Sequence, residues 1–336
     1  MQALDREAHG PDMDLFAFHP NGTRAQAVAS RVRAGLADSL AVSLRALGEE
    51  RALAGEDLVA RLRSGPIAPR VFGGYTELVE AIFADNIDTA HIIAEELCAA
   101  DFGRVGPLRI VTLTERHLGR DQPARYRRLI DDDEQLALEI EALGPDEFAA
   151  ASRRVEQAIG LLDAGAPDIA EELRALVHEI VLVDKDGDRY FGASSFQLWG
   201  ALFLKLNATA SRVEIAEQLA HECAHALLFG LGMGEPLVDN EPEELYPSPL
   251  RSDPRPMDGV VHATYVIARM HYTLARLVQS GLLTEEETHE ARQRIARNAL
   301  GYNEGAAVID GDARWTEAGK AALSSAKAYM TSAAAH

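Results

Sequence analysis

Hydrophobic residues in the first half of the chain recur at spacings of three and four, the period of one helix face. The stretches with this pattern are residues 23–62, 75–99 and 135–163. Gly55 and Gly65 are expected to interrupt the first stretch, whereas the second is predicted to be one long helix. Residues 1–177 are therefore predicted to form a mainly helical N-terminal region.

Short runs with alternating or β-branched residues predict strands rather than helices. These runs are residues 108–113, 180–183, 190–195 and 201–206. Because most of them follow residue 178, we expect a small sheet in a C-terminal region, residues 178–336. The two regions are also compatible with one continuous fold.

The C-terminal region contains the clearest helix signal of the chain. Ser211 and Glu214 have the spacing of a capping box, and Gly230 and Gly232 are expected to end the helix that begins there. A proline-rich, irregular segment follows at residues 235–256. Further helical patterns occupy residues 259–279, 284–300 and 316–330.

The charge balance excludes some classes of partner. The 336 residues include 33 Lys+Arg and 53 Asp+Glu, which gives a net charge of −20. This charge repels nucleic-acid phosphates and anionic lipid headgroups. The most basic stretch, residues 125–128, is followed at once by the acidic residues 131–134, so we expect a self-compensating helix surface there. Neither nucleic acid nor a membrane is a predicted partner.

Cysteine content and hydropathy favour a cytoplasmic location. Cys98 and Cys223 are too few for a disulfide framework, and both are predicted to be buried thiols on helices. The first thirty residues contain no apolar core of signal-peptide length. No stretch approaches the roughly 20 apolar residues that a membrane span requires.

A metal-binding motif lies inside the helix that begins after Ser211. His221, Glu222 and His225 form an H-E-x-x-H pattern. Residues four apart lie on the same face of a helix, so both imidazoles can bind one metal ion. The alternative is a pair of solvated or hydrogen-bonded histidines on a helix face. If a metal binds, a third ligand must come from elsewhere in the chain.

Candidates for this third ligand separate the known classes of H-E-x-x-H enzyme. Leu228 and Leu231 occupy the positions where a metzincin requires glycine and histidine, which excludes that class. A thermolysin-like peptidase takes a later glutamate, and the candidates are Glu241, Glu243 and Glu244. We prefer His262, at the start of the helix after the proline-rich segment, although a packed core histidine is the alternative there.

The segment before His262 resembles part of a known family. Residues 246–265 carry Pro-x-Arg-x-Asp-Pro-Arg-Pro followed by Gly-x-x-His-x-x-Tyr, after an H-E-x-x-H helix. This arrangement is similar to the H-E-x-x-H proteins of peptide natural-product clusters, which are regarded as α-ketoglutarate-dependent peptide β-hydroxylases. The similarity is most specific over residues 194–270. Leu250 stands where many relatives have tryptophan, a departure that concerns subfamily and substrate.

The resemblance implies an Fe(II) enzyme that uses α-ketoglutarate and O₂. Its products are succinate, CO₂ and a ribosomally made precursor peptide in which a β-C–H has become C–OH. His221, His225 and His262 would be the iron ligands, in place of the usual two histidines and one carboxylate. Arg255, and after it Arg251, would bind the distal carboxylate of the keto acid. Salt bridges to nearby acids are the alternative for both arginines.

Glu222 distinguishes the competing functions. In a zinc-dependent peptidase it is the general base that activates a metal-bound water. In the hydroxylase it is expected to orient a ligand or contact the substrate. A third possibility is a helical peptide-binding module whose histidines are structural. Together, the helix and strand patterns predict an α+β fold, predominantly helical, in which the small β-sheet packs against the metal-bearing helices.

Overall fold

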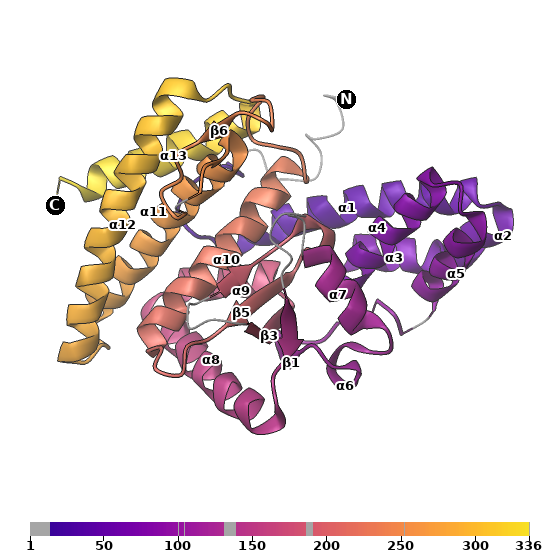
Figure 1. Ribbon diagram of the computed structural model, residues 1–336, viewed down its shortest axis with the longest axis horizontal. Helices are drawn as coiled ribbons and strands as arrows, with labels where there is room; N and C mark the ends of the chain where they lie inside the picture. The colour runs from indigo at the N-terminus through magenta and orange to yellow at the C-terminus, as the bar shows by residue number, and fades with distance from the viewer. Residues whose placement is uncertain are drawn as a thin grey trace. The chain divides into compact units, whose positions relative to one another are not determined.

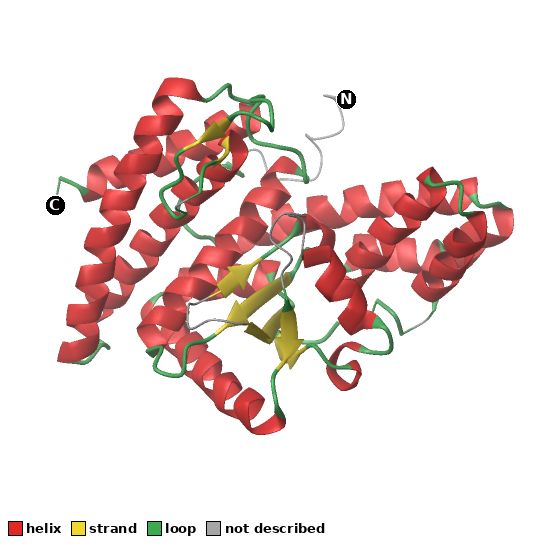
Figure 2. Cartoon of the chain, in the orientation of Figure 1, coloured by secondary structure: helices red, strands yellow, loops and turns green. Residues whose placement is uncertain are grey.

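The computed structural model shows a predominantly helical chain with small mixed sheets (Figures 1 and 2). The structure describes residues 14–99, 101–103, 105–130, 139–185, 191–251 and 253–335. The predicted predominance of helices and the predicted small sheet are therefore confirmed. Whether the sheet packs against the histidine-bearing helices stays a prediction, because the relative placement of the two parts of the chain is not determined.

The chain divides into two compact units that are interleaved along the sequence. The histidine unit comprises the described parts of Met1–Val28, Arg154–Ala175 and Thr209–His336. The sheet unit comprises the described parts of Ala29–Arg153 and Leu176–Ala208. The H-E-x-x-H motif and His262 both belong to the histidine unit.

The sheet unit is organised around a mixed sheet. Strands β1 (Arg109–Thr112), β3 (Glu179–Lys185) and β5 (Ala201–Lys205) are parallel, with Ile180 of the central strand opposite Ile110 on one side and Leu202 on the other. Two short strands add antiparallel partners: β4 (Phe191–Ala193) pairs with β5, and β2 (Ile140–Ala142) pairs with β3. The predicted strands are confirmed, except that Tyr190 lies outside the described residues.

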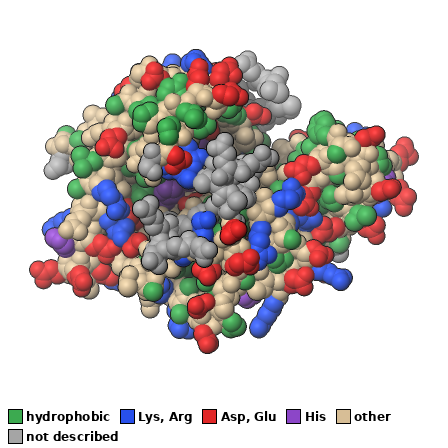
Figure 3. Space-filling view, viewed as in Figure 1, with side chains coloured by type: hydrophobic (Ala, Val, Ile, Leu, Met, Phe, Trp, Pro, Cys, Tyr) green, Lys and Arg blue, Asp and Glu red, His purple; other side chains and the backbone are tan. Residues whose placement is uncertain are grey.

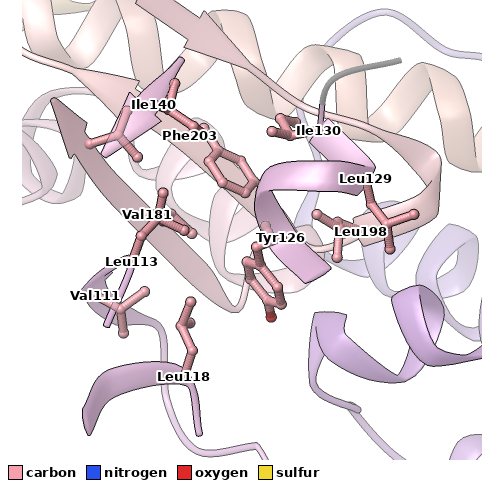
Figure 4. Close-up of a cluster of buried hydrophobic side chains, with 12 residues drawn as sticks. Val111, Leu113, Leu118, Tyr126, Leu129, Ile130, Ile140, Val181, Leu198 and Phe203 are labelled. Carbon is pink, nitrogen blue, oxygen red and sulfur yellow. The ribbon is translucent and has the colours of Figure 1, made fainter. Parts of the chain in front are cut away.

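Apolar side chains on one face of this sheet form a core with short helices. Val111, Val181 and Phe203 come from the three parallel strands (Figure 4). They are direct neighbours across the sheet and therefore point to the same face. Tyr126 and Leu129 of α7 (Gln122–Ile130) cover them. The burial of these large apolar side chains stabilises the sheet unit.

The helical segments before the sheet are shorter than the sequence predicts. They are α1 (Gly22–Ala46), α2 (Glu49–Ala54), α3 (Glu56–Ser64), α4 (Pro69–Phe83) and α5 (Ile87–Cys98). The single helix predicted over residues 75–99 is wrong. Asp85 adopts a positive φ of 55°, and the Asn86 side chain accepts a hydrogen bond from the Thr89 N–H to begin α5. A capping asparagine within an apolar pattern thus ends one helix and starts the next.

The helix predicted over residues 135–163 is also only partly correct. Residues 140–142 form β2, and the helix α8 runs from Pro145 to Gly165. Pro145 at its first position lacks the N–H that a helix start leaves unpaired, so it favours this boundary. Pairing of β2 with β3 overrides the weak helical periodicity before it. Residues 131–138 lie outside the described part of the chain.

The histidine unit is built on long helices. They are α9 (Pro167–Leu176), α10 (Arg212–Gly232), α11 (Met257–Ser280), α12 (Glu285–Asp312) and α13 (Glu317–Ala333). Helices α10, α12 and α13 all pack against α11, most of whose residues are buried. Between α10 and α11, the strands β6 (Leu245–Tyr246) and β7 (Arg255–Pro256) form a two-stranded ribbon.

Half of the predicted capping box forms at the start of α10. The Ser211 hydroxyl accepts a hydrogen bond from the Glu214 N–H at 3.0 Å, which satisfies one of the unpaired donors of the first turn. The Glu214 carboxylate pairs with Arg294 of α12 at 2.8 Å. The helix ends where Met233 adopts a left-handed conformation. The position of the H-E-x-x-H motif along this helix is therefore anchored at both ends.

A buried ionic triad joins three distant segments of the histidine unit. Arg24 of α1 and Arg269 of α11 both bind the Glu172 carboxylate of α9, one on each oxygen. All three residues are buried. Arg269 also donates a hydrogen bond to the carbonyl of Phe18 and lies over its ring. One carboxylate thus compensates two guanidinium groups in an environment without water.

Basic residues of the sheet unit are neutralised by neighbouring acids. Arg125 pairs with Glu77 and Glu96, and Arg128 also pairs with Glu77. These acids come from α4 and α5, whereas the predicted partners 131–134 lie outside the described residues. Figure 3 shows acidic and basic side chains interspersed over the visible face. No described helix is long and apolar enough to cross a membrane.

Candidate metal centre

The histidines of the motif are partly accessible in the C-terminal half of α10. From Leu219 to Leu231 its residues are buried, except for His221, His225 and Phe229, which are partly accessible. These three residues are spaced by four, so they lie in a line on one helix face. The two histidines of the motif therefore lie on a face of α10 that a ligand can contact.

The two histidines of the motif have the spacing that one metal ion requires. Their Nε2 atoms are 3.2 Å apart. For metal–nitrogen bonds of about 2.0–2.1 Å, two ligand nitrogens lie about 2.9 Å apart at a right angle and about 3.3 Å apart at a tetrahedral angle. The observed distance falls between these values. The pair therefore fits either an octahedral ion or a tetrahedral one.

His262 lies beside this pair. Because α10 and α11 are antiparallel, His262 is next to His225 and Met270 is next to His221. The Nδ1 atoms of His262 and His225 are 3.1 Å apart, and their rings are nearly parallel at 17°. The structure thus gathers the three predicted ligands into one cluster with His225 in its middle.

The orientation of the His225 ring decides whether all three histidines can share one ion. Its Nε2 is directed at His221 and its Nδ1 at His262, so the two contacts use opposite nitrogens. In an imidazole, Cε1 lies between the two nitrogens. A half-turn about χ2 exchanges Nε2 with Cε1 at almost constant ring shape. Among the described residues, the group whose ligand atoms already lie together is His221, Glu222 and His225. Binding of one ion by all three histidines therefore requires this rotation, which directs Nε2 of His225 between the facing nitrogens of His221 and His262.

Glu222 lies at the edge of the same cluster. Its side chain is buried, and its Oε1 is 3.7 Å from Nε2 of His221. Ligand atoms of His221, Glu222 and His225 all lie within 4.8 Å of one another. A carboxylate at this position can accept a proton from a metal-bound water or orient a ligand, so the distance alone is compatible with both roles considered for it.

Burial keeps the three imidazoles neutral. Desolvation lowers the pKa of His221 to about 4 and the pKa of His225 well below its usual value. Burial also lowers the pKa of His262, although the nearby Asp258 opposes this shift. A neutral imidazole offers a lone pair to a metal, whereas an imidazolium does not. At neutral pH the cluster is therefore in the protonation state that binds metal.

Three residues that the sequence analysis did not assign to the site surround the histidines. The Met270 sulfur lies 3.2 Å from Nδ1 of His221, and Oδ2 of Asp258 lies 3.8 Å from Nε2 of His262. The Phe229 ring packs against His262 with 5.1 Å between centroids. Asp258 and Phe229 are each four residues from a histidine on the same helix, a spacing that could have identified them. Met270 becomes a neighbour only through the packing of α11 on α10.

The two candidate arginines for the keto acid share one partner. Nε of Arg255 is 2.9 Å from Oδ2 of Asp253, and Nε of Arg251 is 3.4 Å from Oδ1 of the same carboxylate. These are contacts of the kind that the sequence analysis held as the alternative. Arg255 is the more buried of the two, and its Cβ lies near Gly259, one turn before His262 along the chain. Its predicted role stays a prediction.

The glutamates considered for a thermolysin-like centre occupy other positions. Glu244 accepts a hydrogen bond from the Tyr246 hydroxyl at 2.9 Å and pairs with Arg314. These hydrogen bonds lower the pKa of its carboxyl group. Glu241 and Glu243 are exposed. Of the candidates for a third ligand, His262 is therefore the one that the structure places against the motif.

The two cysteines are in the thiol form and differ in burial. Cys223, inside the motif, is buried, and burial raises its pKa to about 12, so it is a packing residue. Cys98 at the end of α5 is half-buried. The prediction of a buried thiol is thus confirmed fully for Cys223 alone.

No family model matches the sequence, and no curated protein matches it. A functional assignment therefore depends on the histidine cluster, its surroundings and the resemblance of residues 194–270.

Proposed function

We propose that the chain is a mononuclear metalloenzyme with His221, His225 and His262 as ligands, and that it hydroxylates a peptide with Fe(II), α-ketoglutarate and O₂. The observation that supports the proposal most is that three neutral imidazoles lie side by side, His221 and His225 from α10 and His262 from α11. A merely structural histidine pair would not need a third histidine from another helix. The resemblance then favours iron and a keto acid over zinc.

Each residue of the centre has a defined task in this proposal. Iron, α-ketoglutarate and O₂, when bound, would supply the oxidising power for the hydroxylation. His221, His225 and His262 would hold the ion, with room left beside them for the keto acid and O₂. Phe229, on the same face of α10, limits access of water and gives an apolar contact for the substrate side chain. Glu222 orients a neighbouring ligand from within the buried edge of the site.

The net charge of the protein bears on its substrate. With a charge of −20, the protein attracts basic polypeptides and repels acidic ones. A precursor peptide with a basic leader or core segment is therefore the favoured partner. Its binding is expected to weaken as the salt concentration rises, because salt screens this attraction.

A zinc-dependent peptidase is the second candidate, and the location of Glu222 favours it. A carboxylate 3.7 Å from a ligand nitrogen is close enough to take a proton from a metal-bound water. The same three histidines would then bind zinc in a tetrahedral site with one open position. The two functions predict different products from the same peptide.

The deciding experiment uses the full chain, loaded with Fe(II) under anaerobic conditions and mixed with a cognate precursor peptide. Exposure to O₂ is expected to add the mass of one oxygen atom to the peptide, with one succinate formed for each hydroxylation and no product without α-ketoglutarate. A peptide cleaved in two, with zinc and without α-ketoglutarate, would support the peptidase instead. The Glu222→Gln variant should abolish hydrolysis but retain measurable oxygenation.

Replacing Arg255 provides a separate prediction for the keto acid. The Arg255→Gln variant is expected to bind α-ketoglutarate about 10- to 100-fold more weakly, because a charge-assisted hydrogen bond contributes roughly 1.5–3 kcal/mol. Calorimetric titration of the anaerobic iron form measures this directly. Arg251→Gln is the matched control, since this arginine is more exposed and shares the partner Asp253. A larger effect at Arg251 would reverse the assignment of the two arginines.

A further inference from the structure

In His221 and His262, the ring nitrogen that does not face His225 lies next to another side chain. Nδ1 of His221 meets the Met270 sulfur, so its Nε2 is the nitrogen that faces His225. For His262 the order is reversed: Nε2 faces Asp258, and Nδ1 faces His225. The two histidines on either side of His225 therefore present different ring nitrogens to the middle of the cluster.

Asp258 is held in place independently of the histidine. Its Oδ1 accepts a hydrogen bond from the Leu237 N–H at 2.7 Å, which connects the segment after α10 to the first turn of α11. The other oxygen, Oδ2, is directed towards His262, which lies one turn later on the same helix. The separation of 3.8 Å is too long for a hydrogen bond, but a movement of about 1 Å would form one.

We propose that Asp258 is the positioning residue of the metal centre and that it makes His262 bind the metal through Nδ1. A carboxylate that accepts the Nε2–H of a ligand histidine fixes the tautomer, leaves Nδ1 with the lone pair and increases its basicity. The inference rests on the proposed three-histidine centre but not on the choice between iron and zinc. It assigns a role to Asp258 that the H-E-x-x-H pattern does not contain.

The Asp258→Asn variant isolates this role. Asparagine keeps an oxygen that can accept the Leu237 N–H, but its NH₂ group would face the Nε2–H of His262, and two donors cannot bond to each other. We expect the affinity for Co(II) or Zn(II) to fall about 10- to 100-fold, the effect typical of losing such a partner. Competition with a chromophoric chelator measures this affinity without any enzymatic assay.

Two further variants make the result specific. Asp239→Asn removes the same charge from an exposed side chain two residues from Leu237, and its metal affinity should equal that of the unmodified protein. His262→Ala removes the ligand itself and should bind metal more weakly than Asp258→Asn. If His262→Ala binds normally, the three-histidine centre is wrong. If only His262→Ala is impaired and Asp258→Asn is not, the role of Asp258 is wrong.

A measurement on the unmodified protein guards against a variant that does not fold. Long-range ¹H–¹⁵N correlation spectra of the zinc-loaded protein distinguish a protonated ring nitrogen from a metal-bound one. For His262 the expected pattern is a protonated Nε2 and a zinc-bound Nδ1, and for His221 the expected pattern is the reverse. A zinc-bound Nε2 on His262 would overturn the inference.

Discussion

Replacing Glu172 with glutamine is expected to lower the free energy of unfolding of the histidine unit by about 3–5 kcal/mol. The carboxylate is buried and shared by Arg24 and Arg269, which are buried as well. Without it, two buried guanidinium groups lose their paired carboxylate and keep only the weaker attraction of Asp14 and Asp168, and such a loss is strongly destabilising. In the described structure, Nε and Nη1 of Arg24 have no hydrogen-bond partner. No further acceptor near these atoms would therefore replace the lost carboxylate. Denaturant unfolding followed by circular dichroism measures the difference.

Glu171 provides the matched control for this substitution. It is the adjacent glutamate on α9 but is exposed, so Glu171→Gln should change the free energy of unfolding by no more than about 0.5 kcal/mol. A triple variant with Met at both arginine positions and Leu at 172 should recover most of the lost stability, because an apolar triad of similar volume needs no charge compensation. Equal stability of Glu172→Gln and the unmodified protein would contradict the argument.

The sequence predicts α10 and its histidines well because the relevant signals are local. Ser211 caps the helix, and the i to i+4 spacing of His221 and His225 fixes their shared face before any tertiary contact forms. His262 was predicted from its place after the proline-rich segment and from the resemblance. The structure adds its approach to His225, which depends on the antiparallel packing of α11 on α10.

Elements that depend on partners far along the chain were predicted less well. Residues 140–142 have helical periodicity but form a strand because the end of β3, residues 183–185, extends beyond its pairing with β1 and binds β2 instead. The break between α4 and α5 depends on a capping side chain, Asn86, that apolar spacing does not register. The interleaving of the two units is likewise invisible to a reading along the sequence, since Arg24, Glu172 and Arg269 are 97 or more positions apart from one another.

The site residues around the histidines show the same division between local and long-range information. Asp258 lies four residues before His262, and Phe229 lies four residues after His225. Their position beside the histidines can therefore be predicted from helical spacing alone. The contact between Met270 and His221 exists only because two helices cross at that point. Which ring nitrogen each histidine presents depends on these outer partners, and hence on the tertiary structure.

The largest expected functional effect is the loss of metal binding in His225→Ala. One ring nitrogen of His225 lies 3.1 Å from a nitrogen of His262, and the other lies 3.2 Å from a nitrogen of His221. Replacing His225 therefore removes the middle one of the three proposed metal ligands. Loss of a partner outside the ligand shell typically costs 10- to 100-fold in affinity, and loss of a central ligand should therefore cost more than about 100-fold. Metal stoichiometry after anaerobic reconstitution and dialysis measures this. His289→Ala, at an exposed histidine of α12, should retain one metal per chain. Full metal content in His225→Ala would mean that the ion binds elsewhere and that the cluster is a packing feature.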